Sequence, residues 1–262
     1  MLQKGKPIPE ELQPPRPEVY KEFVAQIFDQ ETIQEFRDQA LRVQTDWNYF
    51  NAQNKLNLLK TFHEILFADF FPMPASKTTY NRVDAAALFY SSEWSMSFTE
   101  NFLKQNFDLV FKVWLHESYH GFMHFLSLRL NYTTAAEVIQ APPAILNLAR
   151  QYPIPPQEKI AITLAKRNLI GTLDRANSQG PTAPVAGMRV SVNSGYMDLK
   201  SRAGMGWDSY YLNVEILVEN LTEVSFKALL PNARFRRSYT TAEKYIQKRL
   251  NGIAPAWARQ DD

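Results

Sequence analysis

The chain has 262 residues, of which 45% are apolar and 21% charged, as is usual for a soluble globular protein that buries a sizeable core. Its 29 Lys and Arg against 27 Asp and Glu leave a formal net charge of +2, which gives no case for nucleic acid or an anionic membrane as a partner. Cysteine is absent, which excludes disulfides, thiolate metal ligands and cysteine nucleophiles.

The N-terminal residues lack the apolar segment of a secretory signal, and no stretch approaches the ~20 apolar residues of a membrane span. We therefore expect a cytoplasmic protein that does not enter a membrane, although delivery elsewhere by a non-classical route is not excluded. Residues 1–17 contain five prolines and few apolar residues, which predicts an extended tail. We expect residues 18–262 to form a single domain with a helical N-terminal portion, 18–75.

Helical periodicity and β-hairpin patterns alternate along the rest of the chain. In chain order, the patterns predict helices at 18–29, 31–46 and 53–70, a hairpin at 83–98, helices at 99–130 and 157–178, a second hairpin at 188–200, and helices at 209–230 and 241–251. The predicted fold class is therefore α+β, mostly helical with a small antiparallel sheet or hairpins.

The most informative residues lie within the predicted helix at 99–130. His116, Glu117 and His120 form an H-E-x-x-H motif. Residues four apart share one face of a helix, so the two imidazoles can bind one Zn²⁺ while Glu117 takes a proton from the water that the ion activates. The surrounding residues are mostly large and apolar, which predicts a buried helix whose polar groups need partners. A metal ion meets that need, and the alternative is a set of core histidines bonded to the backbone.

A third histidine, His124, follows on the same predicted helix. It lies ~6 Å beyond His120 along the helix axis and ~12 Å beyond His116, so one ion on a straight helix does not easily contact all three. We expect His124 in the wall of the site or behind the ligands, and the third protein ligand elsewhere in the chain.

The predicted helix at 209–230 carries three glutamates spaced four residues apart. On a helical wheel Glu219 falls between large apolar residues, and a carboxylate in such a place needs a buried partner. We therefore favour Glu219 as the third metal ligand, with Glu215 and Asp174 as alternatives. Glu223, one turn further on, is expected to orient a ligating histidine.

These features resemble the H-E-x-x-H zinc metallopeptidases, the zincins, and most of all the gluzincin branch, whose third ligand is a glutamate on a later helix. The resemblance covers residues 79–130 and 209–230, under a third of the chain, and includes a match of 219–223 to the branch's E-x-x-A-D/E pattern with threonine in place of alanine. It implies a zincin-like fold, in which the small sheet packs beside a central H-E-x-x-H helix. It also implies that strand 94–98 is the edge that runs antiparallel to the substrate.

The activity that this resemblance implies is the hydrolysis of a polypeptide substrate by a zinc-dependent endopeptidase, with Glu117 as general base. Members often use a tyrosine or histidine near the third ligand to stabilise the oxyanion, for which Tyr210 and Tyr211 are the candidates, although half-buried packing is an equal alternative. The enzyme would be a housekeeping protease, or an effector or toxin with one target. The alternatives are a non-catalytic zincin-fold binding or assembly module, and a helical protein in which the motif arose by chance.

Overall fold

The computed structural model describes residues 15–79, 86–152, 159–178 and 210–233. In chain order these residues form α1 (Pro17–Ile27), α2 (Gln30–Asp46), the 3₁₀ turn η2 (Trp47–Tyr49), α3 (Ala52–Leu66), β1 (Ala75–Thr79), β2 (Ala87–Tyr90), β3 (Ser95–Thr99), α4 (Glu100–Leu103), α5 (Phe107–Leu130), α6 (Tyr132–Ile139), α7 (Pro143–Gln151), α8 (Lys159–Ser178), the π-helical turn η4 (Tyr211–Glu215) and α11 (Ile216–Leu229). This part of the chain is mostly helical with one small sheet, in agreement with the predicted α+β class.

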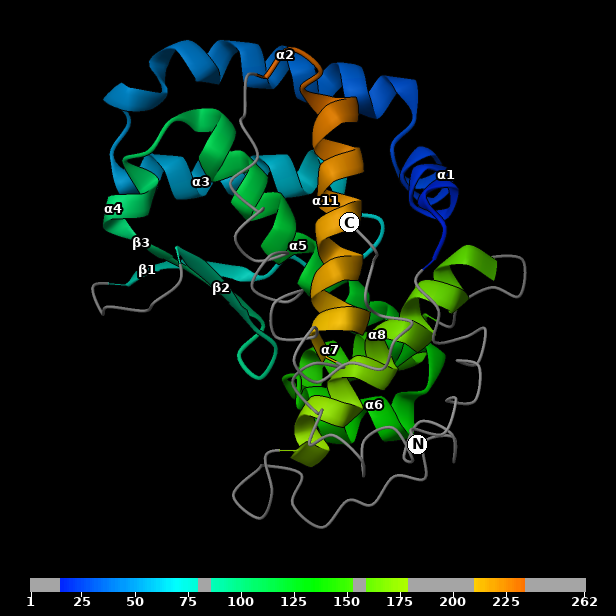
Figure 1. Cartoon of the computed structure of the whole chain (residues 1–262). Helices are drawn as coiled ribbons and strands as arrows, with labels where there is room; N and C mark the ends of the chain where they lie inside the picture. The colour runs from blue at the N-terminus through cyan, green and yellow to red at the C-terminus, as the bar shows by residue number, and fades with distance from the viewer. Residues whose placement is uncertain (1–14, 80–85, 153–158, 179–209, 234–262) are drawn as a thin grey trace, which may run out of the picture.

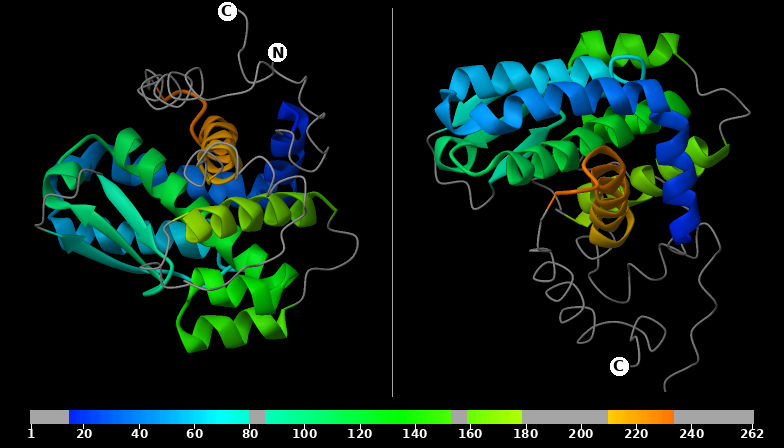
Figure 2. Two further views of the ribbon diagram at one scale, coloured as in Figure 1. Left: turned by 60° about the horizontal axis from the view of Figure 1, so that its bottom comes forward. Right: turned by 90° about the horizontal axis from the view of Figure 1, so that it is seen from above.

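Helix α5 runs through the middle of the described structure, with helices packed on several sides and the sheet beside it (Figures 1 and 2). All residues from Trp114 to Leu128 are buried, as expected for a helix that is apolar nearly all round. The helix begins after Asn106, whose Oδ1 accepts a hydrogen bond of 2.9 Å from the Leu109 N–H. This cap divides the helix predicted at 99–130 into α4 and α5.

Aromatic side chains join the N-terminal helices to α5. Phe36 of α2 stacks on Phe111 of α5 with ring centroids 4.7 Å apart, and Phe62 of α3 meets the same ring edge-on at 5.7 Å. Helices α1 and α2 lie where helical spacing predicts them. Helix α3 ends at Leu66 rather than at residue 70, because Phe67 leaves helical geometry and the chain turns there.

The sheet has three strands in the order β1-β3-β2. Strands β2 and β3 pair antiparallel with Ala87 opposite Phe98, which confirms the hairpin predicted at 83–98. Strand β1, which the sequence pattern did not predict, pairs parallel to β3 with Ala75 opposite Ser95, so the sheet is mixed rather than antiparallel. The expectation that 94–98 forms the edge strand is therefore wrong: β3 is the central strand, and β2 is the edge nearest to α5.

The remaining described helices complete the structure around the C-terminal half of α5. Residues 131–151, for which no element was predicted, form α6 and α7, and the helix predicted at 157–178 is present as α8. Most of the tail, the hairpin predicted at 188–200 and the helix predicted at 241–251 lie outside the described residues. No helix in the described ranges is both long and apolar enough to cross a membrane.

The buried imidazole of His63 in α3 predicts a loss of stability in weak acid. Its Nε2–H donates to the Phe71 carbonyl at 3.2 Å, and burial lowers the pKa of the ring from 6.5 to about 4. The neutral ring stabilises the fold fully above pH 6.5, and this contribution is lost as the pH falls towards 4, because the unfolded chain takes up the proton first. At pH 5 the loss is about 2 kcal/mol. In urea unfolding at pH 7 and pH 5, wild type should lose about that much more stability than His63→Phe. Equal pH dependence in both proteins would contradict this account.

Candidate metal centre

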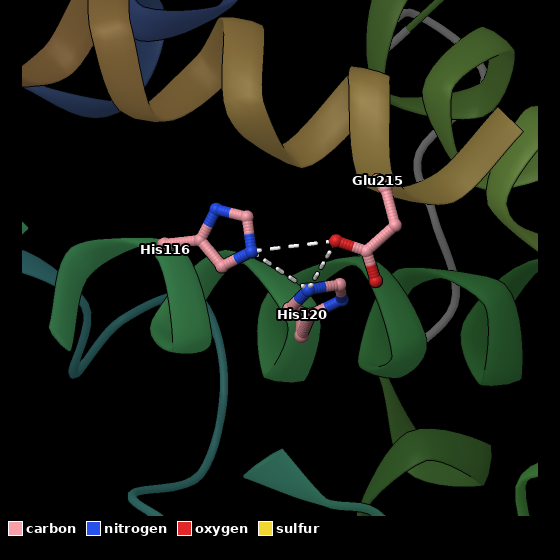
Figure 3. Close-up of side chains that lie close together, drawn as sticks. All are labelled: His116, His120 and Glu215. Atoms are coloured by element: carbon pink, nitrogen blue, oxygen red, sulfur yellow. Dashed lines mark hydrogen bonds and ion pairs between the residues drawn. The ribbon is translucent and has the colours of Figure 1, made fainter. Parts of the chain in front are cut away.

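His116 and His120 lie one turn apart on α5, and both rings point towards Glu215 at the end of η4 (Figure 3). The two Nε2 atoms are 3.1 Å apart, and Glu215 Oε2 lies 3.5 Å from each. Three atoms with these separations lie on a circle with a radius of about 2.0 Å, which is close to the length of zinc bonds to imidazole nitrogen and carboxylate oxygen. These three side chains therefore form a group that can hold a metal ion.

The charges of the group suit a cation. Burial alone would raise the pKa of the Glu215 carboxyl, but the two imidazoles beside it hold that pKa well below its usual range. Burial lowers the pKa of His116, yet the hydrogen bond and charge of Glu215, together with Glu117 and Glu219, raise it above its usual value overall. The site thus concentrates negative charge around two imidazoles, an arrangement in which a bound cation replaces protons on the rings.

Glu215, rather than the favoured Glu219, lies beside both imidazoles. Glu219 is one turn further along α11, and its Oε2 is 3.7 Å from Nδ1 of His116, on the other side of that ring from Glu215. This position suits a carboxylate that orients a ligating imidazole through its second nitrogen. Glu223, which was expected in that role, instead forms an ion pair with Lys112 of α5.

The helical wheel favoured Glu219, whereas Glu215 is the glutamate that lies beside both imidazoles in the structure. A wheel drawn over 209–230 assumes 3.6 residues in every turn, whereas η4 contains more residues per turn, so the wheel does not describe the side-chain directions before Glu215. Glu215 and Glu219 also share one helix face, so the wheel could not decide which of them lies level with the two histidines.

Glu117 is buried beside the two histidines and contacts the edge of the sheet. Its Oε2 accepts a hydrogen bond of 2.8 Å from the Phe89 N–H of β2. Burial raises the pKa of its carboxyl, although the charges of His120 and His116 oppose this. The general base predicted from the motif is therefore adjacent to the two imidazoles and held by a backbone donor.

The edge of β2 that is turned away from β3 faces this carboxylate. Thr99 N–H donates to the Ala86 carbonyl, and hydrogen bonds alternate along an antiparallel pair, so the backbone groups of Ala87 and Phe89 point away from β3. Gly121 of α5 permits this approach, because a Cβ there would lie only 3.2 Å from the Phe89 ring and 3.0 Å from Phe71. The glycine directly after His120 therefore lets the strand reach the site.

These elements enclose a cavity of about 520 Å³. Strand β2 forms one wall, and α5 contributes the three motif residues and His124. Helix α6, helix α8, Tyr210, Glu215 and the turn after β2 provide the rest of the lining. The cavity size is typical of sites for small ligands or for a few residues of a peptide.

His124 lines the cavity, in the wall position that helix geometry predicted. Its Nδ1 lies 3.2 Å from the amide nitrogen of Asn168 in α8, and burial lowers the pKa of its ring to about 3. The ring is thus neutral and lies outside the group of three side chains that can hold a metal ion.

Tyr210, one of the two predicted oxyanion donors, is 7% exposed and lines the same cavity. The guanidinium carbon of Arg175 lies 4.5 Å from the centroid of its ring. The side chains of Tyr211 and Asp174 lie outside the described part of the chain, so their predicted roles stay predictions. Sequence reasoning did not find Arg175, Asn168 or Phe89, because none of them belongs to a local motif.

The geometry predicts that Glu215 matters more to metal affinity than Glu219 does. Glu215→Ala removes a ligand and should weaken zinc binding by roughly 100-fold or more, whereas Glu219→Ala should cost about 10- to 100-fold by loosening His116. Competition with a chromogenic chelator measures both affinities. Glu35→Ala on the exposed face of α2 is the matched control and should bind zinc as wild type does. A larger loss in Glu219→Ala than in Glu215→Ala would restore Glu219 as the ligand.

Comparison with known proteins identifies no relative of this chain. No protein-family model, no curated protein and no solved structure matches it at a significant level. The function therefore has to be inferred from the site itself.

Proposed function

We propose that the chain is a zinc-dependent peptidase in which His116, His120 and Glu215 hold the ion and Glu117 is the general base. The main support is the convergence of three possible ligand atoms, which come from helices about a hundred residues apart and lie 3.1 to 3.5 Å from one another. They line a cavity, and the buried Glu117 carboxylate lines it beside them. The arrangement supports the zincin-like reading of the H-E-x-x-H motif.

The donor set favours zinc over other common ions. Two imidazoles and one carboxylate suit Zn²⁺ and leave a fourth position open, whereas Mg²⁺ and Ca²⁺ prefer shells made of oxygen. A bound zinc ion would lower the pKa of a water molecule at the open position and polarise a substrate carbonyl.

Glu117 is placed to move the proton in this reaction. It lies next to His116 in the chain, its carboxylate is fixed by the Phe89 N–H, and burial raises its pKa towards the range in which a carboxylate both accepts and releases a proton. In the proposed mechanism Glu117 accepts a proton from the attacking water and then donates it to the leaving amine.

The edge strand β2 supports a polypeptide as the substrate. Ala87 and Phe89 line the cavity beside Glu117, and because the Phe89 N–H already donates to that carboxylate, the other outward backbone groups of this edge are the ones that would pair with a peptide. An extended peptide can add to such an edge through main-chain hydrogen bonds. We propose β2 for this role in place of strand 94–98.

Tyr210 is the proposed donor to the oxyanion. Burial raises the pKa of its phenol, so the hydroxyl keeps its proton at neutral pH and remains a donor. Tyr211 stays a second candidate for the same role.

Substitution of the base should separate metal binding from catalysis. Purified wild type should contain about one equivalent of zinc and cleave members of a mixed peptide pool, detected by mass spectrometry. Glu117→Gln should retain zinc and lose activity by about 10²- to 10⁴-fold, because only the proton acceptor is removed. His120→Ala should lose the zinc, and Glu35→Gln should change neither property.

Each of the other possible results of this experiment would support a different interpretation of the protein. Wild type that is free of metal after purification without chelator would indicate that the motif arose by chance. Zinc-loaded protein that cleaves no peptide would favour a non-catalytic binding or assembly module. Full activity in Glu117→Gln would remove Glu117 from the mechanism.

A further inference from the structure

We propose that Trp94 is a positioning residue for the general base: its indole fixes Phe89 of β2 against α5 and so places the Phe89 N–H at the Glu117 carboxylate. The catalytic part of this inference rests on the proposed function. The series of contacts from Trp94 to Glu117 does not depend on it.

The backbone of Trp94 has a conformation that is unusual for a bulky residue. Its φ angle is 48°, in the left-handed region, where the Cβ lies too close to a carbonyl oxygen. The other non-glycine residue with a positive φ in the described ranges is Gln140, which ends α6 as many helices end. Trp94 instead closes the turn between β2 and β3, where its N–H donates to the Ser91 carbonyl at 3.2 Å. Glycine would adopt this conformation without steric cost, so the contacts of the indole have to offset the strain.

The indole is anchored outside its own hairpin. Trp94 is 3% exposed, and its Nε1–H donates to the Pro72 carbonyl at 2.8 Å. Its ring also lies beside Phe125 of α5, with centroids 6.3 Å apart and planes inclined at 63°. Two segments that belong to neither β2 nor β3 therefore set the position of the indole.

This anchored indole packs directly on Phe89. The two ring centroids are 5.3 Å apart and the planes are nearly perpendicular at 84°, the edge-to-face arrangement that aromatic pairs favour. The Phe89 ring also lies against Gly121 of α5, where a Cβ would approach it to 3.2 Å. Because Trp94 is itself anchored to α5 through Phe125, a shift of β2 away from this helix would break both contacts of the Phe89 ring.

The hydrogen bond to the general base depends on this arrangement. The Phe89 N–H donates to Glu117 Oε2 at 2.8 Å, and the N–H and the ring belong to the same residue. Such bonds form at about 2.7–3.2 Å, and displacement of a reacting group by about 1 Å can lower a rate by about 10²-fold. Phe89 lines the cavity, whereas Trp94 is not in the lining that the described residues form. Trp94 therefore acts on Glu117 through Phe89 rather than on the substrate.

Exchange of the Phe89 amide proton measures this positioning without turnover. It is followed by NMR in the presence of zinc, on protein that contains isotope-labelled phenylalanine. Trp94→Leu should increase the exchange rate of this amide by about tenfold or more, because its hydrogen bond to Glu117 opens more often. Trp94→Gly, which removes the indole but accepts the left-handed backbone, should have the same effect. Trp94→Phe keeps an aromatic ring and should restore part of the protection.

Trp47→Leu is the matched control for the loss of a buried indole. Trp47 is 1% exposed, its Nε1–H donates to the Gln105 carbonyl at 2.9 Å, and the described cavity lining does not include it. Trp47→Leu should lower stability in urea unfolding but leave the Phe89 amide exchange and kcat as in wild type. Equal acceleration of this amide in Trp47→Leu and Trp94→Leu would indicate a general loss of stability and would overturn the proposal.

Kinetics with a peptide substrate show whether Trp94 acts through the base. Trp94→Leu should lower kcat by about tenfold or more with zinc affinity unchanged, whereas the same substitution in Glu117→Gln protein should cause little further loss. Loss by the same factor in both backgrounds would overturn the positioning role. A Phe89 amide that exchanges at the wild-type rate in both Trp94→Leu and Trp94→Gly would also overturn it. Wild type that holds zinc but cleaves no peptide would instead count against the proposed function, and the amide exchange would still decide whether Trp94 positions Phe89.

Discussion

The structure depends on how helix α5 satisfies the charged and polar groups that it carries through the core. Lys112, His116, Glu117 and His120 are all buried on a helix surrounded by apolar packing. Leaving such groups unpaired costs several kcal/mol each, so the chain must bring partners to them. Helix α11 and the turn before it do so with a carboxylate every four residues. Glu215 lies beside His120, Glu219 beside His116, and Glu223 beside Lys112. The two helices therefore run antiparallel.

The sheet provides the hydrogen-bond partner for Glu117, the remaining buried charged group of this part of α5. Glu117 takes its hydrogen bond from β2, which approaches α5 closely where Gly121 has no side chain. The strand that satisfies the buried carboxylate is also an edge strand of the sheet formed by the described residues, since β3 pairs with β1 on its other side. Strand β2 therefore orients the Glu117 carboxylate and also presents backbone groups beside it.

Much of the secondary structure follows from local pattern, but its exceptions have physical causes. Helices α1, α2 and α8 match their apolar periodicity because spacing of three and four residues is a local property. Strand β1 has no local signature, since its parallel pairing with β3 depends on a contact across about twenty residues. The break before α5 depends on a single capping asparagine inside an otherwise continuous helical pattern.

The sequence by itself determined that His116, Glu117 and His120 share a site, because four-residue spacing on one helix fixes their proximity. It also predicted that His124 lies one turn beyond the other two histidines, since a helical turn sets that separation. Only the tertiary structure decided between Glu215 and Glu219, because the choice depends on how far α11 is shifted along α5 and on the π-helical turn before it. The Phe89 donor, the Asn168 contact and the place of Arg175 were likewise decided by packing, which joins residues whose separation in the chain carries no periodic signal.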